Sequence, residues 1–370
     1  MRKFKLDLYK DFQQYFNLLD VLIKNESSNK ELFLEDIDIS PSSYRRAKNE
    51  GNKIGEIILQ KLAKHFNYNL CDECIIDQIE DKINEIYYAI YYKDYKRYDE
   101  YFDWLDDMLS KRYIIYPIFT LFKLLMILNS KKSPRNILNG LNDLYFEIKS
   151  YESFYENELI EIVEILDVTF KKDIDNYFLS KTYKNELTYH TLATRCNLSG
   201  RYLESIYFCK LAKEKFITDE NYKRIYYINL TLISNYNFLL MFREADLLVQ
   251  KQLLNLNSIN DVGDEYEFTK SLYIITCLGL KKYDEVINSL EKKEALTLTQ
   301  IVCLLMSYYF YDKNNYYITY NELISEEESE NIILCLKYLN EILKSNNKKK
   351  VQELERYDIN KTVLEILKKM

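Results

Sequence analysis

The stretch 200–216, GRYLESIYFCKLAKEKF, decides the fold of this chain, because its pattern returns three times downstream. The related stretches are LMFREADLLVQKQLL at 240–254, LKKYDEVINSLEKK at 280–293 and, more weakly, NNYYITYNELISEEE at 314–328. In each, an aromatic residue precedes a small or β-branched residue by three positions, and the pairs are Tyr202 with Ser205, Phe242 with Ala245, Tyr283 with Val286, and Tyr316 with Thr319. A pattern that returns after roughly 40 residues predicts an array of helical hairpins.

Each member of these pairs has a role in a helical hairpin. We expect the aromatic ring to fill the space between the two helices of its hairpin, and the small residue to let the second helix approach closely. The order Gly200-Arg-Tyr202-x-x-Ser205 resembles the second half of the tetratricopeptide repeat, although most of the spacings exceed that repeat's usual period of about 34 residues. A generic helical solenoid is the alternative.

The composition independently indicates an all-α protein. The 370 residues include only 6 Gly and 3 Pro, which the turns and bulges of sheet proteins use freely. The hydrophobic fraction of 47% and the charged fraction of 29% are those of a folded chain, and the length allows two domains or a repeat array.

Other features argue against membrane, metal and enzyme functions. The longest apolar run, residues 113–128, is too short to span a bilayer and contains Pro117 and Lys123, so we expect a cytoplasmic protein. The pair Cys71 and Cys74 lacks a second pair at zinc-ligand spacing, and the seven cysteines are scattered. Only two histidines and no catalytic or phosphate-loop motif are present, so we predict no enzyme activity, no metal and no cofactor.

A second pattern occupies residues 32–69, LFLEDIDISPSSYRRAKNEGNKIGEIILQKLAKHFNYN. A short apolar helix is followed by a turn, and Ser40-Pro41 is a start signal for the next helix because serine caps a helix and proline fits its first position. That helix is predicted to stop near Gly51, and a further helix follows. A small core is expected from Ile37, Ile39, Tyr44 and Leu62.

This order resembles the lambda-repressor type of helix-turn-helix. The resemblance implies that the helix after Ser40 enters a DNA groove, where arginine suits guanine or phosphate and serine suits bases or backbone. The expected DNA contacts are Ser42, Ser43, Arg45, Arg46, Lys48 and Lys53. Glu35, Asp36 and Asp38 would lie close to the phosphates and repel them. The alternative is therefore that this N-terminal domain, residues 1–69, which we call the head, has lost DNA binding and serves as an effector or dimer surface.

Charge differs between the two parts of the chain. Residues 1–70 carry 12 basic and 10 acidic residues, whereas the remainder carries 39 basic and 48 acidic residues. A weakly positive head on an acidic body is compatible with a head that binds nucleic acid. We predict a helix-turn-helix domain at 1–69 and, at 70–370, a right-handed superhelix of tetratricopeptide-like hairpins with C-terminal capping or dimerisation helices.

The combination of this head with this body resembles the RRNPP peptide-pheromone receptors of low-GC Gram-positive bacteria and their phages. The stretch TYHTLATRCNLSGRYLESIYFCKLAKEKF, residues 188–216, is similar in rhythm to the arbitrium-type receptors. The resemblance implies a homodimer that binds a double-stranded DNA operator, and a short signalling peptide bound by the repeat body.

A groove for the peptide is predicted on the first helix of each hairpin. Asn197 and Asn237 stand at equivalent positions, five residues before the turn aromatics, and an asparagine can hold a peptide amide through both its donor and its acceptor. The expected peptide contacts are His190, Thr194, Asn197, Tyr227, Ser234 and Asn237. The acidic body favours a peptide with positive charge. A peptide-controlled scaffold that binds another protein, and no DNA, is the alternative function.

Overall fold

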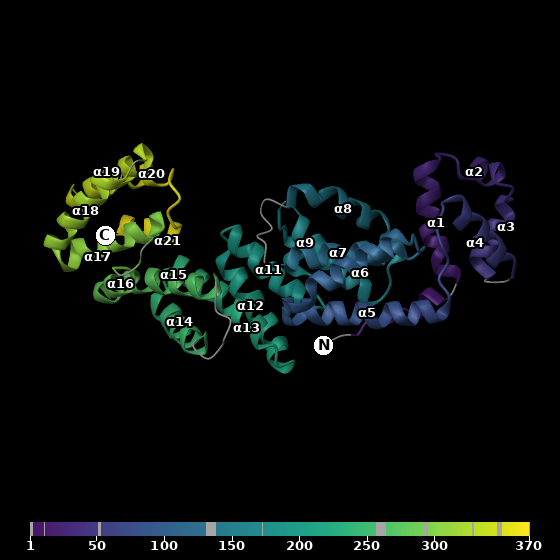
Figure 1. Cartoon of the computed structure of the whole chain (residues 1–370), viewed down its shortest axis with the longest axis horizontal. Helices are drawn as coiled ribbons and strands as arrows, with labels where there is room; N and C mark the ends of the chain where they lie inside the picture. The colour runs from purple at the N-terminus through teal and green to yellow at the C-terminus, as the bar shows by residue number, and fades with distance from the viewer. Residues whose placement is uncertain are drawn as a thin grey trace. The chain divides into compact units, whose positions relative to one another are not determined.

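The computed structural model describes residues 3–10, 12–50, 53–130, 138–171, 173–256, 264–291, 293, 295–327, 329–345 and 350–369. Every named element in these ranges is a helix, and their only bridge pairing is an isolated one between Asn69 and Tyr113 (Figure 1). The prediction of an all-α fold is confirmed. Over the same ranges, no helix combines the length and apolar character that crossing a bilayer requires.

The chain divides into two compact units. The first contains Met1–Arg195 and Leu211–Arg224, and the second contains Cys196–Lys210 and Ile225–Met370. The predicted boundary at residues 69 and 70 lies inside the first unit and stays a prediction.

The helices follow one another along the chain with short connections. The first eleven are α1 (Phe12–Glu26), α2 (Lys30–Asp36), α3 (Pro41–Glu50), α4 (Lys53–His65), α5 (Glu73–Tyr92), α6 (Tyr98–Ser110), α7 (Tyr116–Asn129), α8 (Leu138–Ser150), α9 (Glu158–Phe170), α10 (Asn176–Ser180) and α11 (Glu186–Leu198). Short 3-10 turns lie at η1 (Asp7–Lys10), η2 (Tyr95–Arg97) and η4 (Glu152–Phe154). The rest are α12 (Tyr202–Thr218), α13 (Tyr222–Phe238), α14 (Phe242–Leu256), α15 (Asp264–Gly279), α16 (Tyr283–Leu290), α17 (Leu298–Tyr311), α18 (Lys313–Glu326), α19 (Glu330–Ser345), α20 (Val351–Leu354) and α21 (Lys361–Lys369).

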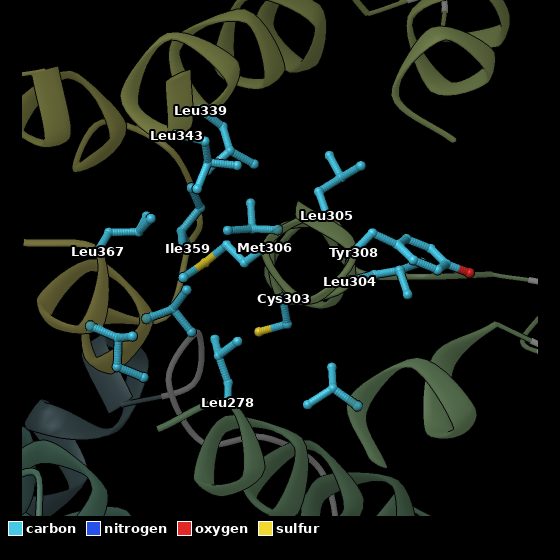
Figure 2. Packing of buried hydrophobic residues seen from close by; sticks show 14 of the residues in the cluster. Leu278, Cys303, Leu304, Leu305, Met306, Tyr308, Leu339, Leu343, Ile359 and Leu367 are labelled. Carbon is cyan, nitrogen blue, oxygen red and sulfur yellow. The ribbon is translucent and has the colours of Figure 1, made fainter. Parts of the chain in front are cut away.

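Each unit has a core helix that is apolar on all sides. In the first unit this helix is α7, where nine of the residues from Pro117 to Met126 are buried. In the second unit it is α17, whose Cys303, Leu304 and Met306 project in different directions in Figure 2. A helix that is apolar all round must be enclosed by other helices. Residues of α15, α19 and α21 therefore pack around α17.

The turn between paired helices repeats in the second unit. Gly200, Leu240 and Lys281 each have a positive φ, of 76°, 59° and 62°. The N–H of the next residue donates to the carbonyl five positions earlier, over 2.8, 2.8 and 2.9 Å in the three turns. This is the Schellman pattern, which satisfies free carbonyls at the end of a helix. The same turn thus returns after 40 and 41 residues, in register with the repeated sequence pattern.

The turn aromatics pack differently from our expectation. The ring of Tyr202 stacks on Phe238 at 4.6 Å, and that of Tyr283 stacks on Phe310 at 5.5 Å. The ring of Phe242 lies so close to Gly279 that no side chain fits there. Each ring therefore packs on the last turn of the first helix of the following hairpin. The prediction that it fills its own hairpin is corrected.

The small partners of these aromatics are buried as predicted, but the fourth pair departs from the pattern. Ser205, Ala245 and Val286 are fully buried. Tyr316 is instead the fourth residue of α18, and Asp312 caps this helix directly after α17 without a left-handed turn.

Polar side chains join successive hairpins of the second unit. Asn197 Nδ2 donates to Asn235 Oδ1 over 2.8 Å, and Asn235 Nδ2 donates to Ser205 Oγ over 2.8 Å. In the next hairpin, Thr276 Oγ1 donates to Asn237 Oδ1 over 3.0 Å. Buried polar bonds of this kind favour one register, because any slip leaves donors and acceptors unpaired.

The repeated turns predict an unusual response to glycine. A residue with a side chain is disfavoured by roughly 1–2 kcal/mol in the left-handed conformation, whereas glycine is not. This penalty exceeds the extra backbone entropy that a glycine loses when the chain folds. We expect Lys281→Gly, at an exposed turn position, to raise the free energy of unfolding by about 0.5–1 kcal/mol, and Gly200→Ala to lower it by about 1 kcal/mol. Thermal unfolding followed by circular dichroism measures both. A lower melting temperature for Lys281→Gly would contradict the turn geometry.

Candidate functional site

The carboxylate of Asp20 on α1 joins three of the four helices of the head, α1, α2 and α3. It accepts a hydrogen bond from Tyr44 Oη over 2.6 Å, forms an ion pair with Lys48 Nζ over 2.6 Å, and also pairs with Lys30. Lys30 Nζ lies 4.2 Å from the centre of the Tyr44 ring. Burial alone would raise the pKa of Asp20, but Lys30, Lys48 and Tyr44 outweigh it and hold this pKa below its usual value.

Helix α3 begins at the predicted serine-proline step. Ser40 Oγ accepts from the N–H of Ser43 over 3.1 Å, and Pro41 is the first residue of the helix. Before it, Asp38 has a φ of 56°, and the N–H of Ile39 donates to the carbonyl of Leu34 over 2.8 Å. This left-handed residue reverses the chain between α2 and α3 within a few residues.

The exposed face of α3 carries four polar residues at helical spacing: Ser42, Arg45, Arg46 and Asn49. Arg45 Nη2 pairs with Glu31 Oε1 on α2 over 2.7 Å, and both side chains are largely exposed. Arg46 forms none of the hydrogen bonds or ion pairs found among the described residues. We call this set the α3 stripe.

Three of the six predicted DNA contacts, Ser43, Lys48 and Lys53, do not belong to the α3 stripe. Lys48 is half-buried, and its ammonium group is bound to Asp20 inside the head. Its contact with the DNA backbone stays a prediction. Ser43 is half-buried and accepts a hydrogen bond from Ser40 Oγ over 2.7 Å. Lys53 is the first residue of α4, and its side chain lies outside the described part of the structure. Asn49 was missed, although its spacing from Ser42, Arg45 and Arg46 places it on the same helical face.

The head is fastened to the body at the end of α4. The N–H of Asn69 donates to the carbonyl of Arg112 over 2.8 Å, and the N–H of Ile114 donates to the carbonyl of Asn69 over 2.9 Å. The rings of Tyr68 and Tyr116 stack at 5.0 Å with an angle of 7° between them. The α3 stripe is therefore presented by a head that is bonded to the rest of the first unit.

The first unit contains two of the predicted peptide contacts, both on α11. His190 is half-exposed, and its pKa is held well below its usual value by the surrounding protein and by the positive charges of Arg224 and Lys93. Thr194 is exposed, and its hydroxyl donates to the carbonyl of His190 over 3.1 Å.

The second unit contains the other four. Asn197, Tyr227 and Ser234 are half-buried, and Tyr227 Oη donates to Glu265 Oε1 over 2.7 Å. Asn237 is 1% exposed, and its amide is bonded to Thr276 and to the carbonyl of Leu272. Because its side chain is almost fully buried and bonded to both residues, Asn237 links two hairpins, and we leave it out of the candidate peptide site.

No group of three or more His, Cys, Asp and Glu side chains within the described ranges is placed to hold a metal ion. Burial raises the pKa of the Cys71 thiol to about 12, which keeps it protonated and unreactive at neutral pH.

No family model, curated protein or solved structure matches this chain. The assignment of a function therefore depends on the geometry of the α3 stripe and of the helical body.

The Asp20 contacts predict how the head responds to acid. A carboxyl group whose pKa is lowered by folding stabilises the protein above its unfolded pKa of about 3.9, and this stability is lost as the pH falls through the lower folded pKa. We expect Asp20→Asn to lower the free energy of unfolding by about 1–2 kcal/mol at pH 7, and by less at pH 3.

Urea unfolding at the two pH values measures this difference. The matched control is Glu35→Gln, which neutralises an exposed carboxylate on α2. An equal effect of Asp20→Asn at pH 7 and pH 3 would show that its charge does not stabilise the head.

Proposed function

We propose that this chain is a cytoplasmic transcription regulator with a helix-turn-helix head at 1–69 and a tetratricopeptide-like body at 70–370. The head would bind a DNA operator, and the body would bind a short signalling peptide. The observation that carries the proposal is the α3 stripe, a row of exposed polar side chains with two arginines on a helix that follows a tight turn.

The local geometry of α2, α3 and α4 supports a helix-turn-helix. Asp38 is left-handed in the α2–α3 turn, where such motifs often place glycine. The helices α3 and α4 also cross closely, since a Cβ added to Gly55 would stand 3.4 Å from the Ala47 carbonyl oxygen. Both features support a compact motif that leaves the opposite face of α3 free for a groove.

The side chains of the α3 stripe suit DNA recognition. Arg46 can bind guanine through two parallel hydrogen bonds or can neutralise a phosphate. Ser42 and Asn49 can exchange hydrogen bonds with base edges, asparagine most readily with adenine. Arg45 would first leave Glu31, which costs little because an exposed ion pair contributes at most about 1 kcal/mol.

The body supports a role in peptide binding and regulation. Repeated turns at Gly200, Leu240 and Lys281 are what a tetratricopeptide-like superhelix requires, and small rotations add along such a stack. We propose that Asn197, Tyr227 and Ser234 of the second unit contact the peptide, while His190 and Thr194 of the first unit stay predicted contacts. In a homodimer paired through the C-terminal helices, the altered superhelix would change the spacing of the two heads and their fit to a palindromic operator.

One observation favours the alternative of a protein-binding scaffold without DNA binding. The helix α2, which precedes the α3 stripe, exposes Glu31, Glu35 and Asp36. These carboxylates would repel phosphates that pass beside α3. A basic segment of a partner protein could instead bind there.

Substitution of the arginines distinguishes the two functions. We expect Arg46→Ala to weaken binding to a selected operator by at least about tenfold, because a bidentate arginine contributes roughly 1–3 kcal/mol of discrimination. The double change Arg45→Ala with Arg46→Ala should abolish specific binding. Lys210→Ala, which removes an exposed charge outside the head, is the matched control.

Selection from random duplexes followed by gel shifts over a salt series provides the measurement. A DNA reader loses affinity steeply as salt increases. Specific binding that survives the double change would refute our choice of recognition helix. Failure to select any sequence would favour the scaffold.

A further inference from the structure

The N-terminal segment Lys3–Leu6 is bound in the first unit as an extended peptide. It has no regular secondary structure and precedes η1, beside α5 (Figure 1). Asn84 Oδ1 on α5 accepts from the N–H of Phe4 over 2.8 Å, and Asn84 Nδ2 donates to the carbonyl of Phe4 over 3.0 Å. One asparagine thus binds both polar groups of one backbone residue, as expected in the recognition of an extended peptide.

A second backbone bond fixes the register of the segment. Glu80 Oε2, one helical turn before Asn84, accepts from the N–H of Leu6 over 2.6 Å. Alternate residues of an extended chain point to the same side. Accordingly, Phe4 and Leu6 are 1% and 0% exposed, whereas Lys3 and Lys5 are exposed.

The Phe4 ring contacts two helices of the first unit. The edge of the Phe4 ring packs on Tyr87 of α5 at 4.8 Å and on Phe122 of α7 at 5.2 Å. We call this region, formed by Glu80, Asn84, Tyr87 and Phe122, the α5–α7 groove.

The charges of the groove and the segment are complementary. The first 13 residues of α5 contain five acidic residues and one lysine: Glu73, Asp77, Glu80, Asp81 and Glu85 against Lys82. The segment contains Lys3 and Lys5. In η1, which follows it, Lys10 forms an ion pair with Asp77 of α5 over 2.7 Å. The groove therefore favours basic sequences.

We propose that the α5–α7 groove is a recognition site for an extended basic peptide with two apolar side chains two positions apart. The chain's own Lys3–Leu6 occupies the site when no such peptide is present. This inference deepens the peptide-binding part of the proposed function, on which it rests, because it adds a second contact region and specifies the peptide's chemistry.

Replacement of the Lys3–Leu6 segment by a bound peptide would affect the contacts that hold α1 of the head. Leu6 leads into η1, where Tyr9 Oη donates to the carbonyl of Phe154 over 2.9 Å, and Tyr15 of α1 donates to the carbonyl of Tyr9. A peptide that displaces Phe4 and Leu6 therefore loosens the connection that positions α1.

The test uses the full-length chain and the blocked, fluorescently labelled peptide KFKLDL, which repeats residues 3–8. In the variant with Phe4→Ala and Leu6→Ala, the chain's own segment no longer competes. A tethered segment acts at an effective concentration of about millimolar, so we expect the peptide to bind this variant at least about tenfold more tightly than the wild type. Fluorescence anisotropy measures the binding, and circular dichroism verifies the fold.

Two matched changes locate the binding site. Asn84→Leu or Glu80→Gln, added separately to the variant, should each weaken binding, and the peptide KAKADL should not bind. Absence of KFKLDL binding to the folded variant would overturn the proposal. Equal binding of KFKLDL and KAKADL, or binding unaffected by both groove changes, would overturn it as well.

The anisotropy measurement contains no DNA, so its result is independent of the head's activity. If KFKLDL binds the groove while operator selection fails, the groove stands and the regulator function fails. If operator binding is specific and KFKLDL does not bind, the groove proposal alone fails.

Discussion

The fixing of helix α5 near its middle and at its C-terminal end is the constraint on which the first unit depends. Near its middle, Asn84 binds the backbone of Phe4. At its C-terminal end, the buried guanidinium of Arg224 donates to the carbonyls of Tyr91 and Ile90 over 3.0 and 2.5 Å, and to Asn129 at the end of α7 over 2.9 Å. A cation there satisfies free carbonyls and the negative ends of two helix dipoles. Buried polar groups of this kind are costly unless all are paired.

This arrangement connects the body to the head through bonded elements. Residues 3–10 extend from α5 to α1, and the Asn69–Arg112 bonds join the end of α4 to the body. The α3 stripe is held through Asp20, which links α1 to Tyr44 and Lys48. A change at α5 can therefore alter how α3 is presented. Coupling through packed helices of this kind requires that they respond as a unit.

The sequence was informative where the signal was local and periodic. Scarce glycine and proline predicted the helices, Ser40-Pro41 predicted the start of α3, and the aromatic pattern predicted the repeated turns. It was uninformative where contacts between residues far apart in the sequence determine how a side chain lies. Lys48 and Asn49 are both polar, so their sequence does not show which is more buried. Lys48 is half-buried because it bonds to Asp20, 28 positions away in the sequence. Likewise, Asn237 is buried because Thr276 packs against it, and the four-residue segment before η1 is too short for any periodicity.

Amide hydrogen exchange, read by mass spectrometry on the full-length chain, tests the coupling through α5 most directly. Arg224→Lys keeps the charge but replaces the planar group that binds three acceptors. Our account predicts faster exchange along all of 73–92 and also in residues 3–10 and α1, because the helix is fixed as one body. Faster exchange confined to residues 90–93 and 221–225 would contradict it, since the two ends of α5 would then be independent.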